Sequence, residues 1–419
     1  MANILLMSLV FAPDGVSTSV LMTELTLELQ ALGHNVTVIT TTPHYNEDPE
    51  ARKAQPLRPK WGKLLYTSDC HGIPVFHVSV SRRADRILSR GWDYLKFHII
   101  SIIVGLTIVK DYDVILAPSP PLTVGLIAWI LGKLRRVPFF YNVQEIYPDI
   151  AVALGILRNR GLIWCMTKVE GFIYKHSRQV LVISEWFRRS LLKKGVPDEK
   201  IVVIPNFVDT DFIQPGARRN SFSKTHGLED KFVILYAGNI GLTHDVESIL
   251  QAARRLIHLP DLCFLIVGDG SRRGWLEEQV TQSEFPNLKL LPYQARSVIP
   301  DMYAGSDICL VTLKKNFAQY TFPSKIYTIM AAGRAAIVAA AKDSELSWVT
   351  QESGVGWTVA PDDAQGLANA IEYAYQQRAE LSAKGLAGRY YVEQHHTRKI
   401  VARQYDQVIR QLGIPTTDA

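Results

Sequence analysis

Short apolar runs alternate with longer helical patterns along most of this chain. Residues 3–11 form a run of β-branched and aliphatic side chains, residues 17–32 carry apolar side chains at helical spacing, and Gly33 ends that pattern. Residues 36–41 then return to a strand-like run. This alternation is typical of βαβ units on a parallel sheet, in which a helix covers the sheet between successive strands.

The same alternation begins again at Phe232. A strand-like run is followed by a turn at residues 239–241, a helical pattern over 245–256 and a second strand-like run that ends at residues 268–270. Between the two halves, residues 205–216 are rich in Pro, Asn and Asp and show no periodicity, which is typical of a domain boundary. The pattern therefore predicts an α/β chain with two doubly wound domains.

We expect these two Rossmann-like domains, residues 1–205 and 206–394, to face each other across a cleft. Open α/β sheets bind ligands beyond the carboxyl ends of their strands, so the cleft is the expected ligand site. The length of 419 residues agrees with this division, since domains typically contain about 100–200 residues.

Two apolar stretches are candidates for membrane spans. Residues 97–109 are uncharged, but they are fewer than the ~20 residues that a spanning helix needs. Residues 114–132 are also uncharged, but three prolines divide them into a strand, a turn and a helix. No transmembrane span is predicted.

The first of these stretches has the residue order of a peripheral membrane anchor. Arg82, Arg83, Arg86 and Arg90 come first, Trp92 and Tyr94 follow, and the apolar run comes last. Cations in this order can meet anionic headgroups while the aromatic rings lie at the membrane boundary. The alternative is a core helix preceded by a solvated basic segment.

Charge divides the chain into unlike halves. Residues 1–205 contain 24 Lys and Arg against 17 Asp and Glu, while the remainder contains 22 against 23. A basic half can face an anionic partner such as a lipid headgroup, a nucleic acid or a phosphorylated substrate, or it can carry ordinary solubilising charge. Nucleic-acid binding is disfavoured, because the excess is modest and forms no stripe interleaved with aromatic residues.

Cysteine and histidine spacing and the start of the chain exclude several classes of protein. The four cysteines are far apart, so neither a CxxC zinc site nor a disulfide scaffold is expected. The eleven histidines show no HxxxH or HExxH spacing, so no metal site is expected. The first residues lack the basic segment of a signal peptide, and we expect a cytoplasmic protein.

Several ordered motifs give the chain a family resemblance. They are LGHNVTVIT, VISEWFRRSLLKKGVPDEKIVVIPNFVDTDFIQP across the domain junction, YAGNIG, FLIVGDG and FPSKIYTIMAAGRA. Over nearly its whole length the chain resembles the GT-B-type glycosyltransferases of retaining family 4, in the bacterial exopolysaccharide and O-antigen branch that includes colanic-acid and fucosamine transferases. Several motifs in this order are specific, whereas one alone would be weak.

The resemblance implies a function and a division of labour between the domains. The enzyme would move a sugar, with retention, from a nucleotide sugar, taken to be a UDP-sugar, to a polyprenyl-diphosphate-linked or other saccharide in cell-surface polysaccharide biosynthesis. The first domain, completed by a C-terminal helix at about residues 395–413, would bind the acceptor, and the second domain would bind the donor. No cofactor is implied, and the acceptor would bring the protein to the inner face of the cytoplasmic membrane as a peripheral protein.

Candidate donor-binding residues lie first in the turn after the strand at Phe232. Gly238, Asn239 and Gly241 mark the change from strand to helix, where backbone amides can point at donor phosphates. Relatives typically carry an arginine after the first glycine and a lysine five residues further on, where this chain has Asn239 and His244. The alternative is a structural βα turn.

Lys325 is the candidate cation for the leaving diphosphate, with Ser324 beside it. It lies in FPSK, directly before a helical pattern. Relatives usually have two glutamates eight positions apart here, where this chain has Tyr320 and Thr328, so Thr328 and backbone groups are candidates for the sugar and ribose contacts. The alternative is a solvated surface lysine.

Candidate acceptor-side residues lie in the first domain. Glu145 follows a strand-like run at a place where relatives often carry His-Asp, and a carboxylate there can accept the acceptor's proton or stabilise the positive sugar. Asp149 is the second candidate, and Gly15 permits close approach of a phosphate or acceptor sugar. A dedicated base is not required in front-face retaining transfer, and a carboxylate that bonds loop amides is the alternative.

Two other functions fit the same architecture. A nucleotide-sugar 2-epimerase would also need a diphosphate cleft but no membrane. A non-catalytic protein that binds sugar nucleotides or lipid would account for the missing arginine, lysine and glutamate pair.

Overall fold

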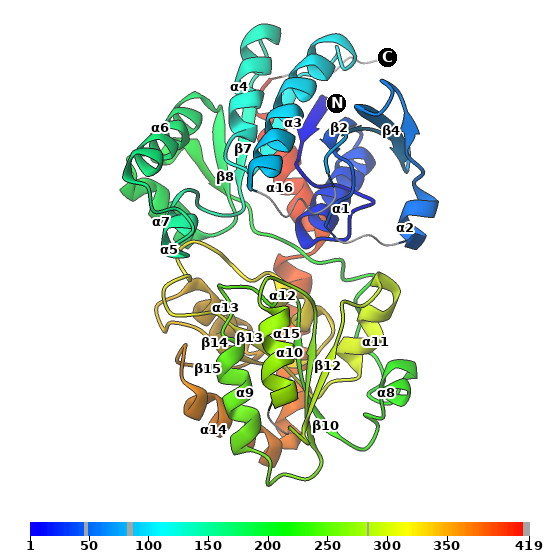
Figure 1. Cartoon of the computed structure of the whole chain (residues 1–419), viewed down its shortest axis with the longest axis vertical. Coiled ribbons are helices and arrows are strands. Elements are labelled where there is room, and N and C mark those ends of the chain that lie inside the picture. Colours follow the sequence, from blue (N-terminus) through cyan, green and yellow to red (C-terminus); the bar gives the residue numbers. More distant parts are fainter. Residues whose placement is uncertain (46–48, 82–86, 283–284, 414–419) are drawn as a thin grey trace. The chain divides into compact units, whose positions relative to one another are not determined.

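The computed structural model describes residues 1–45, 49–81, 87–282 and 285–413, which divide into two compact units. Unit 1 contains Met1–Asn206 together with the chain from Arg398 onward, and unit 2 contains Phe207–Thr397. Each unit is an α/β domain with its own largely parallel sheet (Figure 1). The predicted fold class, two doubly wound α/β domains, is confirmed.

Among its described residues, unit 1 has a nine-stranded sheet in the order β3-β4-β5-β2-β1-β6-β7-β8-β9. The strands are β1 (Asn3–Met7), β2 (Asn35–Thr41), β3 (Arg58–Pro59), β4 (Leu65–Cys70), β5 (Ile73–Val78), β6 (Val114–Pro118), β7 (Phe139–Val143), β8 (Gln179–Val182) and β9 (Ile201–Val203). Near one edge, β4 pairs antiparallel with both β3 and β5, and the other pairs among the described strands of this sheet are parallel. The strand expected over residues 3–11 ends at Met7, and the Ser8 hydroxyl directly after it donates to the Val10 carbonyl at 2.7 Å.

Helices cover both faces of this sheet. They are α1 (Ser17–Ala31), α2 (Pro49–Ala54), α3 (Ile87–Thr107), α4 (Val124–Arg135), α5 (Asp149–Ala153), α6 (Arg160–His176), α7 (Glu185–Lys193) and α16 (Arg398–Arg410). α4 lies between α3 and α6 over one face, while α1 and α16 pack together (Figure 1). The strand order runs in one direction from β1 to β2 and in the other from β6 onward. Because crossovers between parallel strands are right-handed, this change of direction places the connecting helices on opposite faces of the sheet.

The C-terminal helix α16 is part of unit 1 although it follows unit 2 in the sequence. Three side-chain contacts hold it: Asn142 donates to the Tyr405 hydroxyl at 2.6 Å, Asp406 lies 2.8 Å from His34, and Arg398 lies 2.9 Å from Glu28. The chain therefore leaves unit 1 at residue 206 and returns at residue 398.

Unit 2 has six parallel strands in the order β12-β11-β10-β13-β14-β15 among its described residues. The strands are β10 (Phe232–Ala237), β11 (Leu262–Val267), β12 (Leu288–Leu291), β13 (Ile308–Thr312), β14 (Ala335–Ala339) and β15 (Gly356–Val359). The helices are α8 (Ser221–Thr225), α9 (Val246–Arg255), α10 (Arg273–Gln282), α11 (Ile299–Ala304), α12 (Lys325–Ala331), α13 (Glu345–Ser353), α14 (Ala364–Gln376) and α15 (Arg378–His395). The order changes direction between β10 and β13, so a ligand is expected beyond the carboxyl ends of these two strands.

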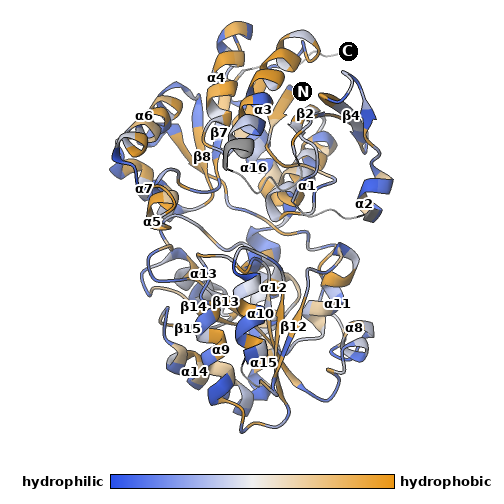
Figure 2. Cartoon of the chain, viewed as in Figure 1, coloured by the Kyte–Doolittle hydropathy of each residue, from blue (hydrophilic) through white to orange (hydrophobic). Residues whose placement is uncertain are grey.

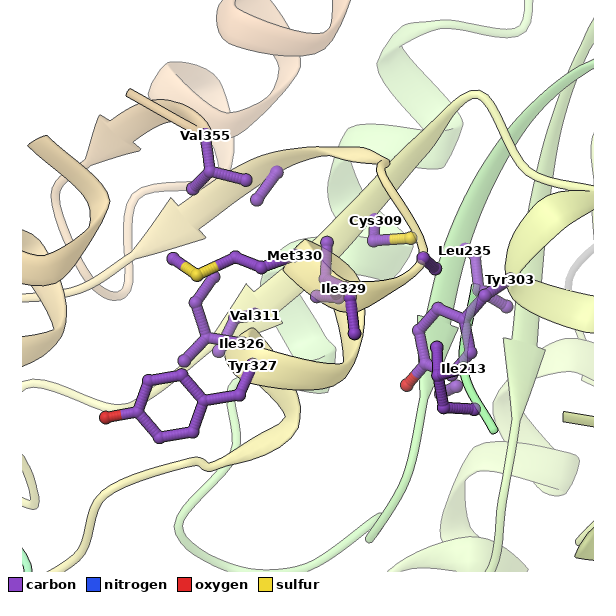
Figure 3. Close-up of a cluster of buried hydrophobic side chains, with 14 of the residues drawn as sticks. Ile213, Leu235, Tyr303, Cys309, Val311, Ile326, Tyr327, Ile329, Met330 and Val355 are labelled. Atoms are coloured by element: carbon purple, nitrogen blue, oxygen red, sulfur yellow. The ribbon is translucent and has the colours of Figure 1, made fainter. Parts of the chain in front are cut away.

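The sheet of unit 2 is apolar on both faces because helices bury both. Along β10, Phe232 and Ile234 face the core beneath α9 and α14, while Val233 and Leu235 face the core beneath α12. Figure 3 shows part of the second core, where α12 presents apolar side chains to β13 and β14. Continuous apolar strands of this kind are typical of parallel sheets covered on both sides.

Two structural features bear on function. In the described ranges, no helix combines the length and the apolar character needed to cross a membrane. Within the same ranges, no three or more His, Cys, Asp and Glu side chains gather where they can hold a metal ion.

Candidate functional site

The carboxyl end of β10 turns sharply beside the carboxyl end of β11. Gly238 has φ +133° and Gly268 has φ +147°, backbone conformations that residues with a side chain rarely adopt. A Cβ on Gly268 would lie 1.9 Å from the Gly238 carbonyl oxygen, so the two turns pack backbone against backbone. The glycines therefore hold a tight turn at the point where this sheet is expected to bind a ligand.

Lys325, the first residue of α12, extends to this glycine turn. Its Nζ atom lies 3.9 Å from the centroid of the Tyr236 ring, and a Cβ on Gly238 would lie 3.0 Å from the same Nζ. The Nζ is buried and has no hydrogen-bond partner in the described part of the chain. Burial lowers the pKa of Lys325 to about 7. The aromatic ring face stabilises the ammonium in part, but an unpaired buried cation also attracts an anion.

His244 lies close to the same ammonium but is not a second cation. Burial, with the nearby charge of Lys325, lowers the pKa of His244 to about 3, so its imidazole is neutral at pH 7. The structure therefore brings three of the donor-binding candidates, Gly238, His244 and Lys325, close together. Tyr236 was not predicted, because an aromatic residue in an apolar strand usually belongs to the core; its place two residues before Gly238 is the one available signal.

The other donor candidates lie around this lysine. Asn239 is exposed and Gly241 is buried, and a Cβ on Gly241 would lie 2.8 Å from the Asn239 side-chain nitrogen. Ser324 occupies the N-cap position of α12 without a side-chain capping bond, and Thr328 lies one helical turn further on. Both side chains are partly exposed. Their contacts with a donor stay predictions.

Gly238→Ala is expected to destabilise unit 2 by about 1–3 kcal/mol. The new methyl group would require the strained φ of +133° and would lie 3.0 Å from the Lys325 ammonium. Thermal unfolding of the purified variant measures the effect. Gly274→Ala is the matched control, because a Cβ there meets nothing within 4 Å and lies in helix α10. Equal unfolding temperatures of the two variants would contradict the packing described above.

Glu145 lies just beyond the carboxyl end of β7 in unit 1. Burial raises the pKa of Glu145 to about 7, and in the described structure this carboxyl makes no hydrogen bond. Burial, then the charge of Glu145 and the phenols of Tyr94 and Tyr45, raise the pKa of Tyr147. The buried carboxyl group of Glu145 therefore lies near the phenol of Tyr147, and its raised pKa suits proton transfer near neutral pH.

Gly15 lies in the loop after β1, at the same edge of the sheet. Its neighbour Asp14 is buried and accepts the backbone N–H groups of His44 at 3.0 Å and Tyr45 at 3.1 Å. The loops after β1 and β2 are thereby joined, and they place Tyr45 beside the loop after β7. The predicted acceptor residues Gly15 and Glu145 lie on one edge of the sheet.

Asp149, the other carboxylate predicted on the acceptor side, is already paired. It forms an ion pair with Lys194, which also contacts Glu170 at 2.7 Å. These contacts join α5, α6 and the end of α7. A structural role therefore accounts for Asp149, and a contact with the acceptor stays a prediction.

A buried polar network that sequence reasoning missed positions the segment before Glu145. The Gln144 side chain donates to Asn142 at 2.6 Å and accepts from Asn206 at 2.9 Å, and its backbone N–H donates to Ser119 at 3.2 Å. Asn142 in turn donates to Tyr405. Networks with satisfied partners are rigid, so this one fixes the backbone from which the Glu145 side chain projects.

A cavity of about 590 Å³ in unit 1 lies at the opposite edge of the sheet, near the amino ends of β7 and β8. Lys200 at its wall donates to the carbonyls of Tyr174 at 3.0 Å and Lys175 at 2.6 Å. A lysine in this place caps the carboxyl end of α6. The cavity is remote from Glu145 within the unit and takes no part in the site.

Two family models match this chain, one in each unit. The glycosyl transferase 4-like domain matches residues 15–206, and the glycosyl transferases group 1 domain matches residues 231–377. The folds and these matches define the class of the protein as a glycosyltransferase. The chain belongs to the GT-B glycosyltransferases, with a glycosyl transferase 4-like first domain and a group 1 second domain.

Curated relatives match most of the chain at low identity. WcaI of Escherichia coli, named for colanic acid biosynthesis, is 26% identical over 391 residues, which cover 91% of this chain and 93% of that protein. The glycosyltransferase WbjE of Pseudomonas aeruginosa is 26% identical over 339 residues, which cover 78% of this chain and 82% of that protein.

Solved structures share the fold across both units. Anabaena HepE in complex with UDP and glucose aligns with a TM-score of 0.75 and 14% identity, covering 98% of this chain and 100% of that one. WaaG, a glycosyltransferase involved in lipopolysaccharide biosynthesis, aligns with a TM-score of 0.67 and 12% identity, covering 96% and 99%. At these identities the likeness shows the fold alone.

Proposed function

We propose that this protein is a retaining glycosyltransferase of cell-surface polysaccharide biosynthesis. It moves a sugar from a UDP-sugar to a polyprenyl-diphosphate-linked saccharide at the inner face of the cytoplasmic membrane. The observation that carries the proposal is the buried, unpaired ammonium of Lys325 beside the glycine turn of Gly238. The UDP complexes of HepE and the name of WcaI support the choice of donor and of pathway.

In this proposal unit 2 binds the donor through its diphosphate. The Lys325 ammonium pairs with the departing phosphate oxygens, and the absence of a side chain at Gly238 permits their close approach. His244 stays neutral and serves as a hydrogen-bonding group rather than a charge. Stabilising a leaving group in a site that is already desolvated lowers the barrier, because the charges need no reorganisation by solvent.

The proposed transfer keeps the configuration of the sugar. The bond from the anomeric carbon to the phosphate oxygen breaks, and a bond from that carbon to the acceptor oxygen forms on the same face. The acceptor's proton passes to the departing phosphate, so no covalent enzyme intermediate is needed. Glu145 in unit 1 acts on the acceptor side, where its ionised carboxylate stabilises the positive sugar or orients the acceptor hydroxyl.

Calorimetry with UDP, ADP and GDP tests the donor, and transfer to lipid extracts tests the acceptor. We expect UDP to bind most tightly, and we expect UDP release from a matching UDP-sugar only when lipid extract is present. No nucleotide binding and no nucleoside-diphosphate release with any donor would overturn the proposal. Conversion of a free nucleotide sugar to its epimer without acceptor would replace it with the epimerase function.

A further inference from the structure

Helix α3 is apolar on two opposite faces. Its inner face, which includes Phe97 and Val104, is fully buried against the sheet and α4. Its outer face carries Trp92, Leu95, Ile99 and Ile103, which are 68%, 48%, 50% and 42% exposed. Figure 2 shows the hydrophobic colour along α3 and the neighbouring α4. We call these four residues the α3 stripe.

The α3 stripe is not ordinary surface. A helix on the surface of a globular protein normally turns its charged and polar residues toward water. Single exposed apolar residues are common on such surfaces. Here the exposed apolar residues recur at intervals of three or four, so they form one continuous line along the helix. An exposed line of this kind indicates a surface that is covered when the protein works.

Charge indicates what covers the stripe. Four arginines, at positions 82, 83, 86 and 90, precede it in the sequence, although the first three lie outside the described residues, and the half of the chain that contains it has an excess of basic residues. The one lysine within the described part of the helix, Lys96, pairs with Asp93 at 3.2 Å. Two copies of this basic unit would repel each other, whereas an anionic lipid surface attracts it.

The stripe also adjoins the acceptor side of unit 1. Tyr94, on the same turn as Trp92 and Leu95, is close enough to Tyr147 to contribute to its raised pKa, after burial and the charge of Glu145. A lipid-linked acceptor presents its saccharide directly above the membrane surface. A helix that carries Tyr94 near Tyr147 and also presents an exposed apolar line therefore suits that acceptor.

We propose that the α3 stripe lies in the interface of an anionic bilayer, with the helix parallel to the membrane plane. The proposal rests on the proposed function for the lipid-linked acceptor. Binding of the α3 stripe to a bilayer is an independent property of unit 1. Trp92 and Tyr94 lie at the headgroup boundary, and Leu95, Ile99 and Ile103 enter the acyl region.

The test is co-sedimentation with vesicles of phosphatidylethanolamine and phosphatidylglycerol, compared with vesicles of phosphatidylcholine. The parent protein is expected to bind the anionic vesicles and to prefer them to the neutral ones. The double variant Ile99→Gln/Ile103→Gln is expected to bind about tenfold more weakly, because it removes two apolar insertions while keeping good helix formers. Circular dichroism checks that it folds.

Ile257→Gln is the matched control, because Ile257 is an isoleucine of unit 2 with a similar exposure of 44%. It is expected to bind vesicles as the parent does. Equal vesicle binding by the double variant and the parent, or no vesicle binding by the parent, would overturn the proposal. So would a parent dimer that the double variant converts to a monomer with no change in vesicle binding.

Calorimetry with UDP in the absence of vesicles separates this proposal from the proposed function. Normal UDP binding by a protein that ignores vesicles contradicts the membrane proposal alone. Vesicle binding by a protein that binds no nucleotide contradicts the proposed function and supports the membrane surface.

Discussion

Lys325→Met is expected to lower kcat/KM for the sugar donor by about a hundred- to a thousandfold. The change keeps most of the side-chain volume but removes the buried ammonium that lies 3.9 Å from the Tyr236 ring. A leaving diphosphate then develops its charge without a cation beside it. Release of UDP from the matching UDP-sugar measures the loss.

The same change is expected to stabilise the free protein. Burial lowers the pKa of folded Lys325 to about 7, whereas an unfolded lysine has a pKa of about 10.4. Between these pH values the unfolded chain holds a proton that the folded chain has released, so stability rises with pH across this window. Below about pH 7 the folded protein holds the unpaired charge in full, so the gain from methionine is largest there.

Thermal unfolding at pH 6 and pH 10 checks the stability effect. We expect Lys325→Met to raise the unfolding temperature at pH 6, by about 2–4 °C for each kcal/mol gained, and to change it little at pH 10. Lys342→Met is the control, because Lys342 is an exposed lysine of the same unit. A Lys325→Met protein that keeps its activity would show that the ammonium does not stabilise the leaving group. One that unfolds earlier than the parent at pH 6 would show that the ammonium is paired in the free protein.

The fold could be predicted because the strands are apolar throughout and the helices are amphipathic. The run FVILYA forms β10, an inner strand of its sheet, and is buried along its whole length. Inner strands of a parallel sheet are covered by helices on both faces and are therefore apolar throughout. Local pattern could not show where a helix docks, and only the family resemblance indicated that a C-terminal helix completes the first domain. Residues 363–412 form one amphipathic stretch in the sequence but three helices in the structure, and α16 belongs to unit 1 because its partners His34 and Asn142 lie hundreds of residues earlier.

The candidate site could be predicted where a motif fixes the local backbone. The glycine turn at Gly238 and the lysine of FPSK come together as the motifs indicated, because each lies at the carboxyl end of a strand or the start of a helix. Contacts between distant segments had no sequence signal. The ion pair that engages Asp149 joins residues 45 positions apart, and the bond from Asn142 to Tyr405 joins residues 263 positions apart.

Glu145→Gln is expected to reduce kcat by about 100- to 10,000-fold while leaving donor binding unchanged. Glutamine keeps the shape of the side chain but cannot carry the negative charge. Burial raises the pKa of Glu145 to about 7, so the parent enzyme should lose activity as the pH falls through 7 and the carboxylate becomes protonated. The variant's residual activity should lack that acid limb, and calorimetry with UDP should show the parent's affinity.

The pH dependence of the free energy of unfolding gives an independent measure of the pKa of the Glu145 carboxyl group. Its folded pKa of about 7 lies above the unfolded value of about 4.3, so between these values the folded chain keeps a proton that the unfolded chain has lost. Unit 1 should therefore lose stability as the pH rises from 4 to 8, and Glu145→Gln should remove that loss. Glu199→Gln is the control, because Glu199 is exposed in the same unit. This variant should lose stability between pH 4 and pH 8 as the parent does. If Glu145→Gln keeps the acid limb and the pH-dependent loss of stability, the carboxyl is neither buried nor catalytic, and Glu145 serves only the local structure.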